Sequence, residues 1–218
     1  MTDWLKRLAR QWVVKPPRLY RALYPHALWR VETPCEAPKT VYLTFDDGPS
    51  PHTTPFILEQ LRQAGFKATF FVVGQNAQRY PHLIHAIRNE GHVVGNHTMR
   101  HIQGLKTNAD AYIEDVDNEN LLLGTTLFRP PHGLMKPGQY SALKNKYRIV
   151  MFDIVTRDYD AAVSTHDIQR AVERNARPGS IIVIHDSLTA EPRLREALPR
   201  VLKWLIHHGY SGRSIPVD

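Results

Sequence analysis

The chain has 218 residues, a formal net charge of +7, 42% hydrophobic residues and 22% charged residues, a composition that excludes a disordered or collagen-like protein. Cys35 is the single cysteine, so an intramolecular disulfide and a cysteine-rich zinc site are both excluded. The longest strongly apolar run, 181–184, is far shorter than the ~20 residues that span a bilayer. Charges interrupt each N-terminal stretch that could serve as the core of a secretion signal, so none is expected.

Basic residues concentrate at the N-terminus, where residues 1–30 hold seven Lys or Arg and one acid. Apolar residues there, two tryptophans among them, fall on one side of a helical wheel, and Pro16 and Pro17 end the predicted helix. We therefore predict a basic amphipathic arm over residues 1–37. This arm either packs on the main domain or contacts an anionic membrane through residues 1–30. Nucleic acid is not an expected partner, because the rest of the chain has no second basic cluster.

After residue 38, apolar runs alternate with helical patterns. Strands are expected at 41–46, 68–73, 92–95, 127–129, 148–152, 180–184 and 213–217. Helices are expected at 54–63, 81–90, 109–123, 139–146, 165–176 and 193–208. This alternation predicts an α/β fold with parallel strands and helical crossovers, and either a barrel or an open doubly wound sheet would satisfy it.

Polar side chains follow the ends of several predicted strands. They are Asp46 and Asp47, His97 and His101, Arg129, Asp158 and His185. Catalytic and ligand-binding groups of α/β folds collect at the carboxyl ends of their strands. We therefore expect these residues to share one rim of the sheet.

The spacing of His97 and His101 lets two imidazoles face the same way on one turn of helix and suits a metal ion. The signal is weak alone, because a chain with 12 histidines contains such pairs by chance. Asp46 and Asp47 are a stronger signal: a turn needs one Asp, and two adjacent carboxylates repel each other unless a cation is near. Two imidazoles and one carboxylate suit Zn²⁺ or a similar divalent ion.

Three more residues are candidates for the site, and two of them also have a structural interpretation. Arg129 is either a surface residue before a proline turn or is fixed against a carboxylate that it keeps ionised. His185 is either a buried core histidine with its hydrogen bonds satisfied or a catalytic residue at the end of a buried strand. Asp158 is a carboxylate that could orient such a histidine.

Taken together, these segments resemble the polysaccharide deacetylases with a NodB-type domain, carbohydrate esterase family 4, over residues 38–217. The family motifs occur in order at 44–49, 97–101, 129–133, 157–159 and 181–185. The resemblance implies a distorted (β/α)7 barrel as the catalytic domain, residues 38–218, behind a short helical N-terminal arm.

The resemblance also implies roles for residues at matching positions. Asp46 would be the general base paired with Arg129, His185 the general acid oriented by Asp158, and Asp47, His97 and His101 the metal ligands. The substrate and oxyanion side would be formed by His132, Pro131, Tyr159 and Val183, with the His132 backbone N–H binding the oxyanion. The family commonly has Tyr at position 132 and Trp at position 159, so we expect an altered pocket for the acetyl methyl group but no lost catalytic group.

The implied function is a metal-dependent hydrolase that removes N-acetyl groups from N-acetylglucosamine-type residues of a glycan and releases acetate. The implied cofactor is one divalent ion, zinc first, with cobalt, nickel or manganese as alternatives. Two other functions stay open: a hydrolase of a non-sugar linear or cyclic amide, and a non-catalytic sugar-binding protein. The expected location is the cytoplasm or the inner membrane face.

Overall fold

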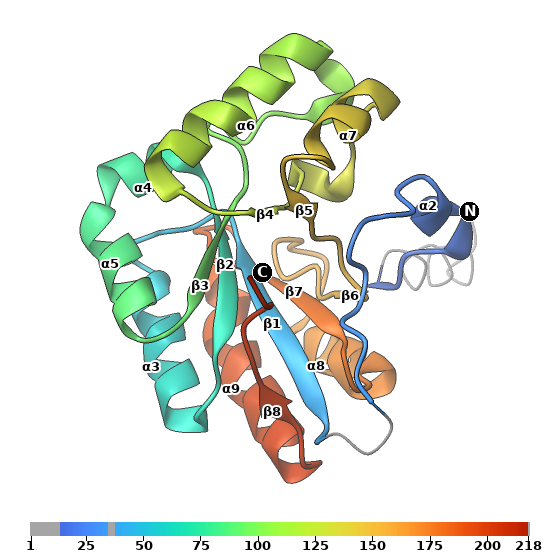
Figure 1. Ribbon diagram of the computed structural model, residues 1–218. Coiled ribbons are helices and arrows are strands. Elements are labelled where there is room, and N and C mark those ends of the chain that lie inside the picture. Colours follow the sequence, from blue (N-terminus) through green and yellow to red (C-terminus); the bar gives the residue numbers. More distant parts are fainter. Residues whose placement is uncertain (1–13, 35–37, 218) are drawn as a thin grey trace.

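The structure is a computed structural model that describes residues 14–34 and 38–217. Its strands form one parallel sheet in the order β5-β4-β3-β2-β1-β7-β6, and β8 pairs with β1 outside this path. The strands are β1 (Thr40–Asp46), β2 (Ala68–Val72), β3 (Val93–Asn96), β4 (Leu127–Phe128), β5 (Arg148–Ile149), β6 (Ile154–Val155), β7 (Ile181–His185) and β8 (Ser211–Gly212). The sheet is curled, with helices around it (Figure 1), which confirms the predicted distorted (β/α)7 barrel.

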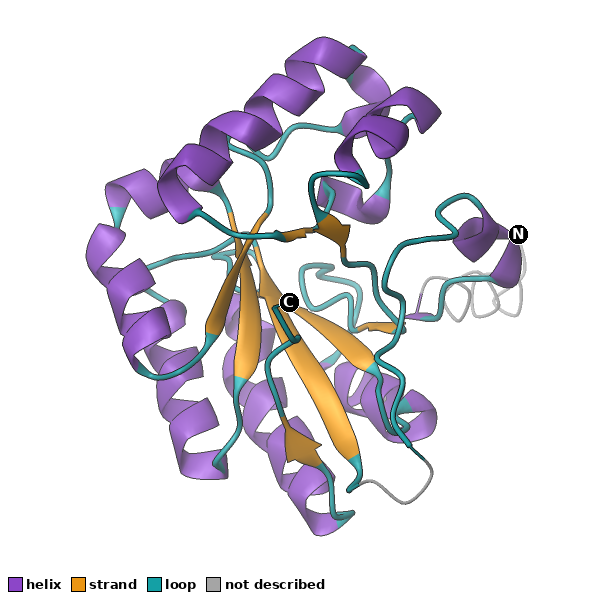
Figure 2. Cartoon of the chain, in the orientation of Figure 1, coloured by secondary structure: helices purple, strands orange, loops and turns teal. Residues whose placement is uncertain are grey.

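Helices lie between most successive strands and surround the sheet (Figure 2), although β6 follows β5 without a helix. In the described part of the chain they are α2 (Arg18–Ala22), α3 (Thr54–Ala64), α4 (Gly74–Arg79), α5 (Pro81–Asn89), α6 (Ala109–Leu123), α7 (Pro137–Leu143), α8 (Thr165–Asn175) and α9 (Glu191–His207). Short 3₁₀ turns lie at Gly104–Lys106 and Pro131–Gly133. Within the described ranges, no helix is both long and apolar enough to cross a membrane.

Strand β1 lies inside the sheet, between β2 and β7, and is buried along its whole length. Such a continuously buried run is typical of a parallel strand that is covered on both faces. Its neighbours are β2 and β7, and the register places Asp46 opposite His185 on β7. The main core cluster packs α3 and α9 against these strands through side chains such as Ile57 and Leu198. The fold therefore brings the carboxyl ends of β1 and β7 directly together.

Two expected strands are wrong in detail, and one helix was not expected. The strand expected at 148–152 is two short strands, β5 and β6, because the chain between them turns to bond elsewhere: Met151 N–H donates to the Leu28 carbonyl and Asp153 N–H to the Ile181 carbonyl. No strand forms at 213–217, and the last strand is β8. Helix α4, which precedes the helix expected at 81–90, was not expected.

The N-terminal segment, residues 14–34, lies between the two ends of the sheet, which are β5 and β6. Leu28 N–H donates to the Ile149 carbonyl at 2.8 Å, and Val31 N–H donates to the Gly179 carbonyl at 2.9 Å. These bonds satisfy backbone groups beside β5 and before β7 that would otherwise be open edges of the sheet. The predicted helix before Pro16 lies outside the described residues. The described part of the arm packs on the barrel.

Asp153, between β5 and β6, fastens this segment to the barrel. Its fully buried carboxylate accepts hydrogen bonds from Arg21 of α2 at 2.8 Å, from Arg177 at 2.9 Å and from Ser180 at 2.8 Å. Burial alone would raise the pKa of Asp153, but the bonds from Arg177 and Arg21 outweigh it and lower the pKa below its usual value. The carboxylate therefore stabilises the folded state as an anion.

Asp153→Asn is expected to lower the free energy of unfolding at pH 7 by about 2–3 kcal/mol, because a neutral amide leaves both arginines without their carboxylate. The pKa of Asp153 is lower in the folded protein than in the unfolded chain, where it is ~3.9. The extra stability of the parent over the variant is therefore complete above pH ~3.9 and is lost as the pH falls through the pKa of Asp153 in the folded protein. Urea unfolding at pH 7 and at a series of acidic pH values measures this. Asp117, whose side chain is 39% exposed and pairs with Lys146, provides a control: Asp117→Asn should cost much less, and equal losses would show that burial of the Asp153 carboxylate does not matter.

Candidate active site

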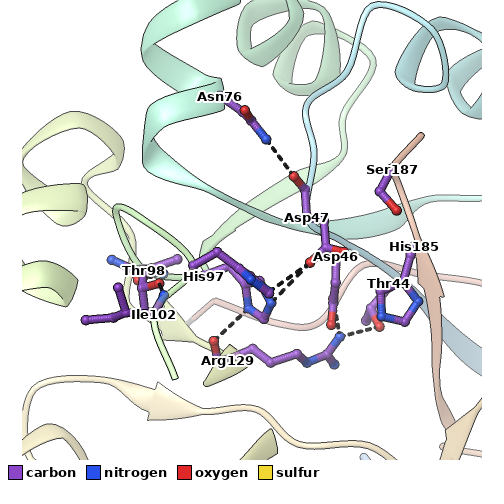
Figure 3. A network of polar contacts seen from close by, with 12 residues as sticks. Thr44, Asp46, Asp47, Asn76, His97, Thr98, Ile102, Arg129, His185 and Ser187 are labelled. Carbon is purple, nitrogen blue, oxygen red and sulfur yellow. Dashed lines mark hydrogen bonds and ion pairs between the residues drawn. The ribbon is translucent and has the colours of Figure 1, made fainter. Parts of the chain in front are cut away.

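The polar residues at the strand ends surround one cavity of about 470 Å³. Six of the seven predicted rim residues line it: Asp46, Asp47, His97, His101, Arg129 and His185. The seventh, Asp158, is fully buried and bonded to His185. Figure 3 shows five of these side chains converging from β1, β7 and the segments after β3 and β4: Asp46, Asp47, His97, Arg129 and His185. The expectation that they share one rim of the sheet is therefore confirmed.

Asp46 and Arg129 form a buried ion pair, with Arg129 Nη1 2.6 Å from Asp46 Oδ1. The guanidinium also donates to Thr44 Oγ1 at 2.6 Å and to the carbonyls of Val150 and Met151. Arg129 is 1% exposed, so each of these bonds is shielded from water. The pairing fixes the direction in which the Asp46 carboxylate points.

Asp47, His97 and His101 form a cluster whose ligand atoms all lie within 4.8 Å of one another. Asp47 Oδ1 is 3.2 Å from His101 Nε2 and 3.7 Å from His97 Nε2. The two histidines follow β3 in a loop, so the expectation that they share a helical turn is wrong. Positive φ angles of 69° at Thr98 and 54° at His101 fold the chain back, and this brings the imidazoles together without a helix.

The surroundings of this cluster suit a cation. His97 Nδ1 lies 2.8 Å from the Arg129 carbonyl oxygen, which can only accept, so Nδ1 carries the proton and Nε2 keeps its lone pair. Burial is the main cause that lowers the pKa of His97 to about 4. Burial alone would raise the pKa of Asp47, but the hydrogen bond from His101 and the nearby histidine charges lower it. One carboxylate and two neutral imidazoles are a donor set typical of zinc.

His185 is held by Asp158 at two points. Its Nδ1 is 2.7 Å from Asp158 Oδ1, and its backbone N–H donates to Oδ2 at 2.8 Å. Burial would lower the pKa of His185, but the charge of Asp158 and its hydrogen bond outweigh burial and raise the pKa to about 9. This imidazole is therefore protonated at neutral pH.

Of the four residues expected to contact the substrate, three line the cavity and one does not. His132 and Val183 line the cavity, as does Tyr159, whose ring centroid is 4.7 Å from that of His185. Pro131 is buried and is not among the lining residues. His132 has a left-handed φ of 58°, and its ring lies beside that of His101.

Sequence reasoning missed two buried acids behind the site. Glu119 of α6 accepts the His97 backbone N–H at 3.1 Å, and burial raises its pKa well above the usual value. Asp186 accepts the hydroxyls of Thr53 and Thr54, and burial raises its pKa to about 7. A Cβ at Gly48 would lie 2.2 Å from Asp186 Oδ2, so only glycine fits there. The buried face of α6 could have indicated from the sequence that Glu119 is buried. No sequence pattern indicated the burial of Asp186.

Three residues of the N-terminal segment also line the cavity, and sequence reasoning did not place them there. They are Pro16, Pro17 and Tyr20. The arm therefore contributes a wall of the site.

A family model for polysaccharide deacetylases matches residues 33–150. A peptidoglycan-N-acetylglucosamine deacetylase of Bacillus cereus is 39% identical over 154 residues, which are 67% of this chain and 56% of that relative. A chitooligosaccharide deacetylase of Rhizobium leguminosarum bv. trifolii is 32% identical over 197 residues, which are 82% of this chain and 91% of that relative.

A solved structure shows the same arrangement of the chain. The crystal structure of a peptidoglycan N-acetylglucosamine deacetylase in complex with an N-hydroxybenzamide superposes with a TM-score of 0.79 and 33% identity, over 92% of this chain and 95% of that chain. The family match, the sequence identities and the shared fold agree with one another. The chain belongs to the polysaccharide deacetylase family, carbohydrate esterase family 4.

Proposed function

We propose that the protein is a metal-dependent hydrolase that removes N-acetyl groups from N-acetylglucosamine-type residues of a glycan and releases acetate. The observation that carries the proposal is one cavity lined by an Asp-His-His cluster, an Arg-bound carboxylate and an Asp-bound histidine. The deacetylase activities named for the relatives support the same reaction. We propose that residues 38–218 form the catalytic domain and that residues 1–37 are an appended arm.

Asp47, His97 and His101 would hold the metal ion. We propose zinc, with cobalt, nickel or manganese as alternatives, because neutral imidazoles and a carboxylate suit all of these ions. A bound divalent ion supplies Lewis-acid activation of the attacking water and of the acetamide carbonyl.

Asp46 is proposed as the general base. Arg129 binds Oδ1 of this carboxylate at 2.6 Å, which leaves the other oxygen to accept a proton from the attacking water. Water adds to the acetyl carbon, and its proton passes to Asp46. Because Arg129 is itself fixed by Thr44, Val150 and Met151, the base is held in position before the substrate binds.

His185 is proposed as the general acid. Asp158 binds Nδ1 and leaves Nε2 as the atom that donates a proton. The pKa of about 9 keeps this proton in place at neutral pH. Its transfer to the sugar nitrogen lets the carbon–nitrogen bond break and yields acetate and a free amine, since an unprotonated amine is a poor leaving group.

The remaining groups would hold the acetyl moiety. The His132 backbone N–H, beside Pro131, is proposed to bind the developing oxyanion, where one good donor contributes roughly 3–4 kcal/mol. Tyr159 and Val183 are proposed to flank the methyl group, and both line the cavity. Tyr159 is 44% exposed, so the pocket is open on that side.

The protein supplied with Zn²⁺ is expected to release acetate and an equal amount of free amine from chitooligosaccharides or peptidoglycan fragments. EDTA and His101→Ala should each abolish release by removing the metal ion. Asp46→Asn should retain the metal and lower kcat by at least about 100-fold, because it removes the base. Acetate assays with metal analysis of each variant measure this, and His82→Ala, an exposed histidine outside the cavity, is the control.

Two results would contradict the proposal. Acetate release that survives both EDTA and Asp46→Asn would exclude the assigned metal ion and base. If metal binds but no glycan yields acetate, the hydrolase of a non-sugar amide or the sugar-binding protein becomes the better description.

We also propose that the protein contacts the anionic inner face of a membrane through residues 1–30, as the alternative to a purely cytoplasmic location. Leu19 of α2 and Leu23, the residue that follows α2, are 82% and 60% exposed, and the exposed Arg18 directly precedes Leu19. Exposed leucines next to basic residues are typical of segments that bind an anionic lipid surface.

Leu19→Ser combined with Leu23→Ser is expected to weaken co-sedimentation with phosphatidylglycerol vesicles by at least about tenfold, because apolar contact with the lipid is lost. Leu121→Ser changes a leucine of α6 that is 86% exposed and should leave binding unchanged. Equal sedimentation of the double variant and the parent would exclude this surface.

A further inference from the structure

The N-terminal segment holds the loop that carries His132. Tyr20 Oη donates a hydrogen bond to the Gly133 carbonyl. Tyr24 Oη donates to the Met135 carbonyl at 2.9 Å and accepts from the Met135 N–H at 2.8 Å. Two hydroxyl groups that precede β1 in the chain thus bind the loop on the C-terminal side of His132.

This loop has an unusual backbone that needs outside support. His132 and Gly133 are consecutive left-handed residues, with φ angles of 58° and 72°. Non-glycine residues such as His132 adopt that conformation only where surrounding contacts impose it. A Cβ at Gly133 would lie 2.7 Å from Tyr20 Oη, so the tyrosine packs directly against this backbone.

Tyr20 is itself held rigidly. Its ring packs edge-on against Trp29, with centroids 5.3 Å apart, and Trp29 packs against Phe152 at 6.0 Å. The adjacent Arg21 lies over the Trp29 ring and binds the buried Asp153. Tyr20 is therefore held by contacts outside the loop, which reach the barrel at Phe152 and Asp153.

Tyr20 also lines the cavity together with Pro16 and Pro17. We propose that Tyr20 is a positioning residue: through the Gly133 carbonyl it places the His132 backbone N–H where the reaction's oxyanion forms. The catalytic part of this inference rests on the proposed deacetylase function. The N-terminal arm is thereby an integral part of the active site.

Tyr20→Phe tests the inference, because it keeps the ring and removes only the hydroxyl group. Tyr210→Phe is the matched control: Tyr210 Oη also donates to a single backbone carbonyl, that of Ala176, at 3.2 Å, and Tyr210 is not among the cavity residues. The readouts on the full chain are kcat and KM for acetate release, hydrogen exchange of the amides at 132–136 and the thermal midpoint.

Tyr20→Phe is expected to lower kcat about tenfold with KM within about twofold, because the displaced donor acts mainly in the transition state. Hydrogen exchange at 132–136 should rise several-fold, while the thermal midpoint stays within about 3 °C of the parent. Tyr210→Phe should change neither kcat nor exchange at 132–136.

Parent-like exchange at 132–136 in Tyr20→Phe would overturn the inference, because the hydroxyl would then not hold the loop. Raised exchange with parent-like kcat would overturn it as well, because the held loop would not matter to the reaction. A parent protein without acetate release would refute the proposed function and, with it, the catalytic role. The exchange measurement would still decide separately whether Tyr20 holds the loop.

Discussion

Arg129 and Asp46 meet 2.6 Å apart where both side chains are almost completely buried. Burying a guanidinium costs several kcal/mol unless its donors are satisfied, and here Thr44, Val150 and Met151 supply the other acceptors. These hydrogen bonds connect Arg129, which follows β4, to β1 and to the segment after β5, and so fix the positions of these elements relative to one another. The Arg129 carbonyl also accepts the hydrogen bond from His97 that fixes its tautomer. One residue thus orients both the proposed base and a proposed metal ligand.

The second constraint is the open seam of the barrel between β5 and β6. The N-terminal segment bonds along this seam, and Asp153 binds it through Arg21. The same placement brings Pro16, Pro17 and Tyr20 to the cavity wall. Closure of the barrel and shaping of the site are therefore achieved by one stretch of chain, in the position shown beside β6 in Figure 1.

Much of the fold and of the candidate site could be predicted, because strands, helices and the residues at their ends can be recognised from short stretches of sequence. Strand ends placed Asp46 and His185 at one rim, since parallel strands share their direction. The loop of His97 and His101 could not be predicted, because residue spacing does not reveal positive φ angles. Neither the split of the strand at 148–152 nor the contact of Tyr20 with Gly133 was predictable, because both depend on hydrogen bonds to other segments of the chain, such as Met151 N–H to the Leu28 carbonyl.

In the proposed mechanism, Arg129 acts on the reaction through Asp46. A double-mutant cycle with Arg129→Lys and Asp46→Asn, read as kcat for acetate release, measures this coupling. Lysine keeps the charge but cannot reproduce the guanidinium fork. We expect Arg129→Lys to lower kcat by at least about 100-fold and the addition of Asp46→Asn to lower it no further, because the pair acts as a unit. If the folded Arg129→Lys protein keeps the parent's kcat, or if the losses of the two substitutions multiply, Arg129 does not act through Asp46.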